Sequence, residues 1–147
     1  MQPWRRFVGT LLAATGMVAL AFTGPATAAP SGSAPLAAIA CRYEYQLSNV
    51  WQGGFTGTVK VTNTGAQPIE DWRLAFDLAP TTARITQAWN GLLISFYAPV
   101  RINAPSWAED LYPGQAHEIG FSGEFVGEQS AVWISNVKLN DTSCSFT

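Results

Sequence analysis

The sequence predicts an all-β domain, an antiparallel β-sandwich with its first and last strands joined by a disulfide. Apolar and polar residues alternate with a period of two in short segments, and no segment carries a sustained helical stripe with caps. Clusters of Gly, Pro and Asn separate these segments at near-regular spacing. Two cysteines, Cys41 and Cys144, bracket the alternating region.

The first 28 residues are typical of an export signal. Arg5 and Arg6 supply a positive start, residues 7–22 form an apolar run without a charge, and residues 26–28 have the small-x-small form of a signal-peptidase site. No later stretch is long and apolar enough to span a membrane. We therefore predict a signal peptide at residues 1–28 and a secreted, extracellular protein.

The charge of the chain argues against several classes of partner. Removal of residues 1–28 takes away two of the eight basic residues and none of the ten acidic ones, which leaves a net charge of −4. Such a chain is a poor partner for nucleic acid or an anionic membrane, so a target that is not recognised by charge is predicted. Residues 29–40 are small and proline-containing and are expected to form a flexible lead before the folded domain, residues 41–147.

Both cysteines remain after the export signal is removed. An even pair in an exported protein indicates a disulfide, and two unpaired buried thiols are the alternative. Closing a loop of about 100 residues stabilises a fold by roughly 4 to 5 kcal/mol in the chain-entropy model.

Alternation predicts seven strands. The clearest is the third, where apolar residues fill every second position from Trp72 to Leu78, so that Trp72 is expected in the core. In chain order the predicted strands are residues 41–47, 55–62, 70–78, 84–88, 92–97, 117–125 and 132–139. This order and spacing are typical of an immunoglobulin-like or jelly-roll sandwich.

Signatures of catalysis are sparse. The single histidine, His117, falls in the core phase of its strand and is expected to be structural. The adjacent acids at 70–71 and 109–110 are expected to be solvated surface residues, although glycoside hydrolysis does use two carboxylates. Phosphate-loop, dinucleotide and zinc-ribbon patterns are absent. The sequence therefore predicts no catalytic residue, no cofactor and no metal site.

Tryptophan is the unusual feature. Trp51, Trp89 and Trp107 occupy polar or turning positions, where exposure of an indole is unfavourable unless a partner covers it. The flat C–H face of a neutral sugar polymer would stack on such rings while amides bond the hydroxyls around it. From spacing alone, ordinary core or interface roles fit these tryptophans equally well. The candidate hydrogen-bonding side chains beside them are Asn49, Gln52, Gln87 and Asn90.

Several motifs carry a resemblance to a known family. They are Asn49-x-Trp51-x-x-Gly54-Phe55, Asp71-Trp72-x-Leu74-x-Phe76, Gln87-Ala88-Trp89, Asn103-Ala104-Pro105-Ser106-Trp107 and Gly120-Phe121-x-Gly123. On these residues the chain resembles the family 2 carbohydrate-binding modules of bacterial cellulases and xylanases, from Cys41 to Cys144. The resemblance implies a nine-stranded sandwich, a terminal disulfide and one face with three coplanar tryptophans, Trp51, Trp89 and Trp107. It implies crystalline cellulose as the ligand, because Gly54 stands where the xylan-binding branch has arginine.

The chain also departs from the family pattern. Ser106 extends the usual Asn-Ala-Pro-Trp motif and can shift Trp107, while Thr58 and Ser122 stand where cellulose binders often carry asparagine. Trp133 has no family counterpart, and its phase with Val137 and Leu139 predicts burial.

These observations predict a secreted, monomeric, non-catalytic module that adsorbs to insoluble cellulose through Trp51, Trp89 and Trp107. Chitin or another β-glucan is the nearest alternative ligand. A small secreted hydrolase that uses Glu109 or Asp110, or a sandwich that docks a protein, are the alternatives from other classes. Because the lead is short and the chain ends three residues after Cys144, a free-standing module is expected.

Overall fold

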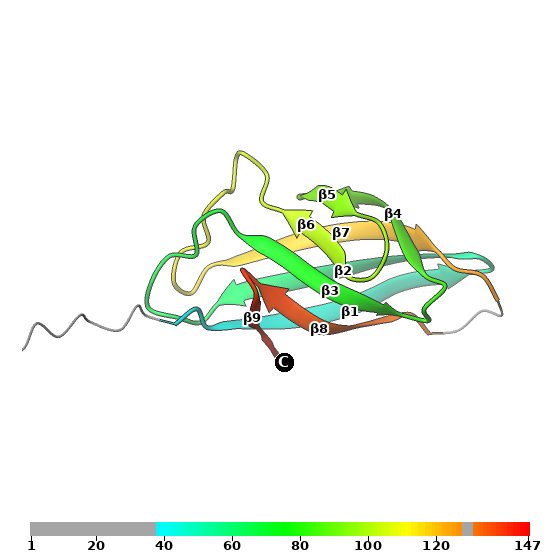
Figure 1. Cartoon of the computed structure of the whole chain (residues 1–147), viewed down its shortest axis with the longest axis horizontal. Coiled ribbons are helices and arrows are strands. Elements are labelled where there is room, and N and C mark those ends of the chain that lie inside the picture. Colours follow the sequence, from blue (N-terminus) through cyan, green and yellow to red (C-terminus); the bar gives the residue numbers. More distant parts are fainter. Residues whose placement is uncertain (1–37, 128–130) are drawn as a thin grey trace, which may run out of the picture. The chain divides into compact units, whose positions relative to one another are not determined.

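The computed structural model describes residues 38–127 and 131–147, so the predicted signal peptide and most of the predicted lead lie outside the described residues. Within those two ranges the chain forms two packed β-sheets and no helix that could cross a membrane (Figure 1). The predicted all-β sandwich is therefore confirmed.

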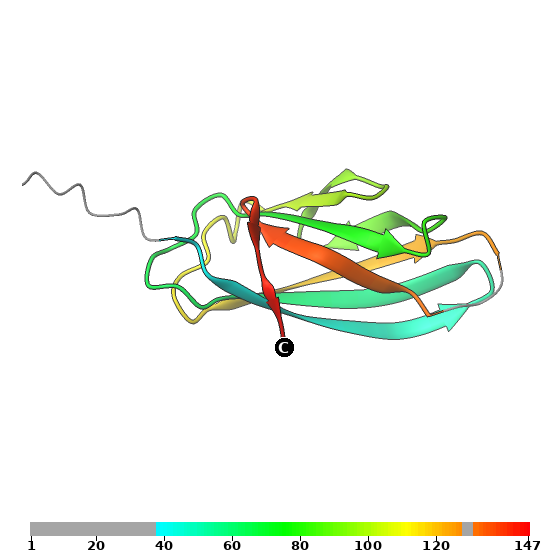
Figure 2. The ribbon, with the colours of Figure 1, turned by 60° about the horizontal axis from the view of Figure 1, so that its bottom comes forward.

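Each sheet has five strands. The first, here called the β1 sheet, has the spatial order β10 (Ser145–Phe146), β1 (Cys41–Trp51), β2 (Gly54–Asn63), β7 (Ala116–Glu124) and β4 (Arg84–Trp89). The second, the β3 sheet, has the order β5 (Leu92–Ser95), β6 (Val100–Asn103), β3 (Arg73–Ala79), β8 (Trp133–Leu139) and β9 (Thr142–Ser143). The strand pairs are antiparallel except β1 with β10, and Figure 2 shows the two layers from a second side.

The core lies between the sheets and follows from the alternation. On β2 the odd-numbered residues from Phe55 to Val61 are buried, while Thr56, Thr58 and Lys60 are only partly buried on the outer face. Phe76 of β3 meets Phe121 of β7 across the sandwich, with ring centroids 5.7 Å apart. Burial of each large apolar side chain contributes about 1.5–3 kcal/mol, so one inner face per sheet is enough to hold the layers together.

Two predictions about single residues of this core are confirmed. Trp72, just before β3, is fully buried. Cys41 and Cys144 form a disulfide with a sequence separation of 103 residues. The disulfide joins the start of β1 to the segment between β9 and β10.

The prediction for Trp133 is wrong, because the side chain is 55% exposed at the start of β8. Lys138 pairs with Ala75 and Ser135 with Asp77, so β8 holds one extra residue opposite β3, and Asn136 in this bulge has φ of 50°. The extra residue of a bulge reverses which side chains of a strand face the core. Val137, after the bulge, therefore faces inward, whereas Trp133, four residues earlier, faces solvent.

The strand count also differs from the prediction. β6 was not predicted, because its four residues contain only two apolar side chains, Val100 and Ile102, and follow a proline. β9 and β10 are two residues each, too short for a period to appear. The described residues thus contain ten strands, compared with seven predicted from alternation and nine implied by the resemblance.

Candidate functional site

The outer face of the β1 sheet is arranged in rows, because paired residues of neighbouring strands lie side by side. The first row is Trp51, Gly54, Glu124 and Arg84; the second is Asn49, Thr56, Ser122 and Gln87; the third is Gln46, Thr58, Gly120 and Trp89. A row of four polar side chains therefore lies between two rows that each contain one indole.

Trp51 and Trp89 are each held over a glycine. A Cβ atom added at Gly54 would overlap the indole of Trp51, and one added at Gly120 would overlap the indole of Trp89. Each ring thus covers the neighbouring strand, and 45% of Trp51 and 42% of Trp89 remain exposed. Gly54 pairs with Glu124 of β7, and Gly120 lies four residues before Glu124 on the same strand. The two glycines, and the rings over them, are therefore about 13 Å apart along the strands and about 5 Å apart across them.

Trp107 lies in the loop between β6 and β7. The backbone N–H of Ala108 donates to the carbonyl of Pro105 at 2.9 Å, which places Ser106 and Trp107 at the two central positions of a β-turn. At 68%, Trp107 is the most exposed of the three indoles. Ser106 is thus part of the turn that presents the ring.

The buried Trp72 anchors this turn. Its indole Nε1–H donates to the carbonyl of Ala108 at 2.8 Å, and its backbone carbonyl accepts from the N–H of Ala104 at 2.9 Å. Its backbone N–H also donates to the carbonyl of Glu109, at 3.3 Å. A core residue therefore fixes the loop on both sides of Trp107.

His117 of β7 connects the segments that carry Trp89 and Trp107. Its imidazole lies 5.0 Å from the ring of Trp72 and 5.4 Å from that of Trp107, measured between centroids. Its Nε2 lies 2.7 Å from the carbonyl oxygen of Asn90. Since a carbonyl only accepts, Nε2 carries the proton in this contact. The predicted structural role of His117 agrees with these contacts.

The predicted polar residues of the site are all exposed. Asn49 and Gln87 occupy the two ends of the polar row, while Gln52 lies in the two-residue turn between β1 and β2. Asn90 follows Trp89 in a turn with φ of 61°, and its carbonyl accepts from His117. The structure brings Asn49 and Gln87 into the space between two indoles, and places Gln52 and Asn90 beside one indole each.

The sequence did not single out Thr56 as a neighbour of the indoles, and it named Ser122 only as a position where cellulose binders often carry asparagine. Both complete the polar row, at paired positions of β2 and β7. Their outward phase on two predicted strands was a usable signal, but the register that pairs them was not available from the sequence.

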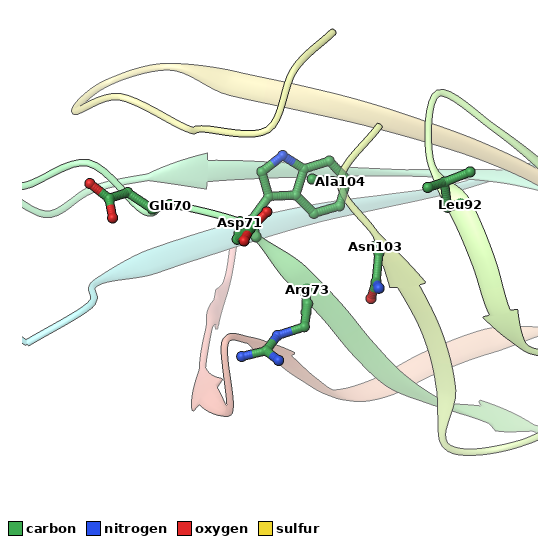
Figure 3. Close-up of a pocket in the computed structure, with 7 residues that line it drawn as sticks. Glu70, Asp71, Arg73, Leu92, Asn103 and Ala104 are labelled. Carbon is green, nitrogen blue, oxygen red and sulfur yellow. The ribbon is translucent and has the colours of Figure 1, made fainter. Parts of the chain in front are cut away.

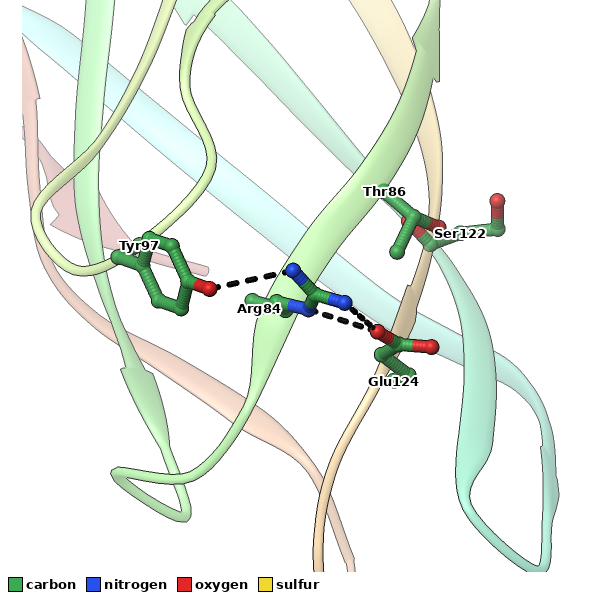
Figure 4. A network of polar contacts seen from close by, with 5 residues as sticks. All are labelled: Arg84, Thr86, Tyr97, Ser122 and Glu124. Carbon is green, nitrogen blue, oxygen red and sulfur yellow. Dashed lines mark hydrogen bonds and ion pairs between the residues drawn. The ribbon is translucent and has the colours of Figure 1, made fainter.

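A polar network at the end of the first row was also missed. The guanidinium of Arg84 donates to Glu124 through both Nε, at 2.7 Å, and Nη2, and to the hydroxyl of Tyr97 at 3.1 Å (Figure 4). Hydrogen bonding to Glu124, and then to Tyr97, raises the pKa of Arg84. Lys60 and Glu44 form the other ion pair of the described residues, on the same face at 2.8 Å. Both ion pairs of the described residues therefore lie on this face.

The described part of the chain contains no group of three or more His, Cys, Asp or Glu side chains placed to hold a metal ion. The acids of the hydrolase alternative, Glu109 and Asp110, follow Trp107 in its loop, where the Glu109 carbonyl bonds to Trp72.

Similar proteins include enzymes that act on polysaccharides. Over 134 residues the chain is 32% identical to endoglucanase CelA of Streptomyces lividans, covering 91% of this chain and 28% of that protein. It is 38% identical over 97 residues to endoglucanase A of Thermobispora bispora, covering 66% of this chain and 21% of that protein. The chain thus spans less than a third of the length of these two relatives. Chitinase C of S. lividans is 32% identical over 132 residues, which cover 90% of this chain and 19% of that protein.

Solved structures have the same fold. The chitin-binding domain of Chi18aC from Streptomyces coelicolor aligns with a TM-score of 0.56 and 28% identity, over 71% of this chain and 94% of that one. The cellulose-binding family 2 domain of ScLPMO10C aligns with a TM-score of 0.54 and 24% identity, over 69% of this chain and 96% of that one.

The model of one family matches almost the whole described domain. It is the family described as the cellulose binding domain, and its match covers residues 41–144, from the first cysteine to the last. With the sandwich, the terminal disulfide and these relatives, the match assigns the chain to the cellulose-binding domain family, that is, to the family 2 carbohydrate-binding modules.

Proposed function

We propose that this domain is a secreted, non-catalytic module that adsorbs to insoluble cellulose through Trp51, Trp89 and Trp107. The observation that carries the proposal is the pair of half-exposed indoles seated on Gly54 and Gly120, on one sheet face, with a polar row between them. A disulfide supports an oxidising, extracellular location.

The mechanism is stacking of ring faces on sugar faces. Covering about 60 Å² of an indole at about 25 cal/mol per Å² contributes about 1.5 kcal/mol, and the glycines keep Trp51 and Trp89 in place before the ligand arrives. Two contacts of His117 support including the third ring, because the imidazole contacts Trp107 and bonds to the residue after Trp89. Asn49, Thr56, Ser122 and Gln87 would bond hydroxyls between the rings.

Sedimentation with microcrystalline cellulose tests the proposal. The wild-type protein should sediment with the polymer, whereas the triple variant Trp51→Ala, Trp89→Ala, Trp107→Ala should stay in the supernatant with an affinity at least about a hundredfold lower. Phe146→Ala is the matched control, because Phe146 is an exposed aromatic side chain on the edge strand β10, where it pairs with Tyr43 near the end of β1 opposite Trp51. If the triple variant still sediments like the wild type, the proposal is wrong.

Salt separates this mechanism from ionic binding. Because the ligand is uncharged, adsorption should be nearly unchanged at about 1 M NaCl. A collapse of adsorption at that concentration would indicate an ionic partner instead.

Chitin is a second candidate ligand, because two of the similar proteins are named for it. One of the solved structures similar to this chain is a chitin-binding domain, and one relative is a chitinase. Parallel sedimentation with crystalline chitin decides which polymer is preferred. Release of soluble sugar from amorphous cellulose, lost in Glu109→Gln, would instead support the hydrolase alternative.

A further inference from the structure

We propose a second carbohydrate-binding site, a trough on the outer face of the β3 sheet that takes a single chain of a soluble, uncharged polysaccharide. It lies on the opposite layer of the sandwich from Trp51 and Trp89, and it does not depend on the function proposed above. We call it the β3 trough.

The trough follows strand β3. Its outward residues are Arg73, Ala75, Asp77 and Ala79, which span about 20 Å at about 3.3 Å per residue. Three hollows of about 480, 290 and 320 Å³ lie along this line. Neighbouring hollows share lining residues: Ala75, Arg101 and Asp141 between the first two, and Arg73 and Asn103 between the last two. Figure 3 shows the last hollow, with Arg73, Asn103 and Leu92 around it.

The walls of the trough leave room for one chain. Arg101 of β6 and Lys138 of β8 both pair with Ala75, so two long exposed side chains flank a methyl group. The two flanking strands are about 10 Å apart, twice the spacing between neighbouring strands. A flat crystal surface cannot enter between such walls, whereas one extended chain can.

Trp133 lies beyond the first hollow, toward the end of β3, and lines none of the three hollows itself. Its indole is 55% exposed, and it pairs with Ala79 at the end of β3. The bulge at Asn136 is what turns Trp133 outward, and the Asn136 amide donates to the carboxylate of Asp77 at 2.7 Å. An indole beside a row of polar groups is an arrangement that suits a sugar ring with hydroxyls at its rim.

The polar groups of the trough suit hydroxyls better than charges. Among the described residues, the side chains of Arg73, Arg101 and Lys138 form no ion pair, and Asp77 and Asp141 lie among them. Carboxylates only accept and guanidinium groups only donate, whereas a hydroxyl does both, so a polyhydroxyl chain can satisfy the two kinds of group in turn. The acids oppose an anionic polymer. The trough contains many ionisable groups, whereas the centre of a protein–protein interface is depleted of charged residues. Its composition therefore fits a polysaccharide better than a protein partner.

Affinity electrophoresis tests the β3 trough in the full chain with Trp51→Ala, Trp89→Ala and Trp107→Ala, so that the other face does not contribute. The probes are soluble mixed-linkage β-glucan, xylan and glucomannan, with polygalacturonate as an anionic polymer. We expect at least one neutral polymer to retard the triple variant, and Trp133→Ala or Arg101→Ala added to it to weaken that affinity about tenfold each. Phe146→Ala in the same background is the control and should change nothing.

Two results overturn the β3 trough. One is the absence of retardation by all three neutral polymers, whatever polygalacturonate does. The other is retardation that either Trp133→Ala or Arg101→Ala leaves unchanged, with folding of each variant checked by circular dichroism. Neither result bears on adsorption to insoluble cellulose, which is tested by comparing sedimentation of the wild type and the triple variant with the solid polymer, so the two proposals fail separately.

Discussion

At the scale of single residues, two glycines decide how two of the exposed indoles lie. Gly54 and Gly120 occupy outward positions on β2 and β7, where any side chain would meet the ring of Trp51 or Trp89. An indole needs a flat floor to present one face to solvent, and only glycine leaves the neighbouring strand bare. The preference for glycine here comes from close approach rather than from a left-handed backbone.

Gly120→Ala should weaken adsorption to cellulose about tenfold, because the added methyl group displaces the ring of Trp89. The measurement is a double-mutant cycle with Trp89→Ala on adsorption isotherms. In the Trp89→Ala background the glycine substitution should have no further effect. An equal loss in both backgrounds would mean that Gly120 acts in some other way.

His117 also affects how the indoles lie, since one imidazole supports Trp107 and bonds to the turn after Trp89. We expect His117→Ala to weaken adsorption by roughly three- to tenfold, because both segments lose a contact. His117→Phe keeps the ring contacts without the hydrogen bond and should restore part of the affinity. If His117→Ala weakens adsorption as much in a Trp107→Ala background as in the wild type, support of Trp107 is not its role.

At the scale of elements, Tyr45 ties strand β1 to the start of β8. Its hydroxyl donates to the carbonyl of Val132 at 2.9 Å, and its ring stacks on Phe121 with centroids 6.4 Å apart. Burial raises the pKa of Tyr45 from the ordinary 10.0 to about 12. The folded state therefore holds this proton to higher pH than the unfolded state does.

That shift predicts a dependence of stability on pH. The contribution of Tyr45 is fully present below pH 10.0 and is lost as the pH rises toward about 12, because the unfolded chain ionises first. Urea unfolding at a series of pH values should show the free energy of unfolding fall across this window. Tyr45→Phe should lose the decline assigned to this residue, and should be about 1 kcal/mol less stable at neutral pH because the carbonyl of Val132 loses its donor. An unchanged decline in Tyr45→Phe would contradict the assignment.

Elements also show where sequence patterns stop being informative. Alternation located β2, β3 and β7 well, because their inner residues, apart from Asn63 and His117 at strand ends, are apolar or glycine at every second position. It failed at Trp133, because the bulge at Asn136 reverses the phase within one strand, and a bulge arises from how two strands meet. Alternation did not predict β6, because its four residues are too few to show a period of two.

At the scale of the whole molecule, the disulfide between Cys41 and Cys144 closes nearly the entire domain. Replacing both cysteines with serine should lower the free energy of unfolding by about 4 to 5 kcal/mol, because the unfolded chain regains the entropy of a loop about 100 residues long. Guanidinium denaturation of this variant, and of the wild type with reductant, measures the loss. Equal midpoints with and without the disulfide would rule out this contribution.

The two faces of the sandwich differ in shape and in charge. The β1 sheet presents two indoles over bare glycines with its ion pairs closed, which suits a flat uncharged surface. Around Ala75 the β3 sheet presents cations and acids that form no ion pair among the described residues, which suits a single polyhydroxyl chain. One small domain thus offers two kinds of surface, because each sheet has only one face in the core.

The sequence by itself determined the sandwich, its buried Trp72 and its disulfide, since these depend on residue type and on a period of two. It also marked the tryptophans at polar and turning positions. Only the tertiary structure decided which residues share a row, that Gly120 lies under Trp89, that His117 links two loops and that Trp133 faces solvent. Those facts depend on register, on a bulge and on contacts between segments far apart in the chain, and no local pattern encodes the distance between two strands that meet only after folding.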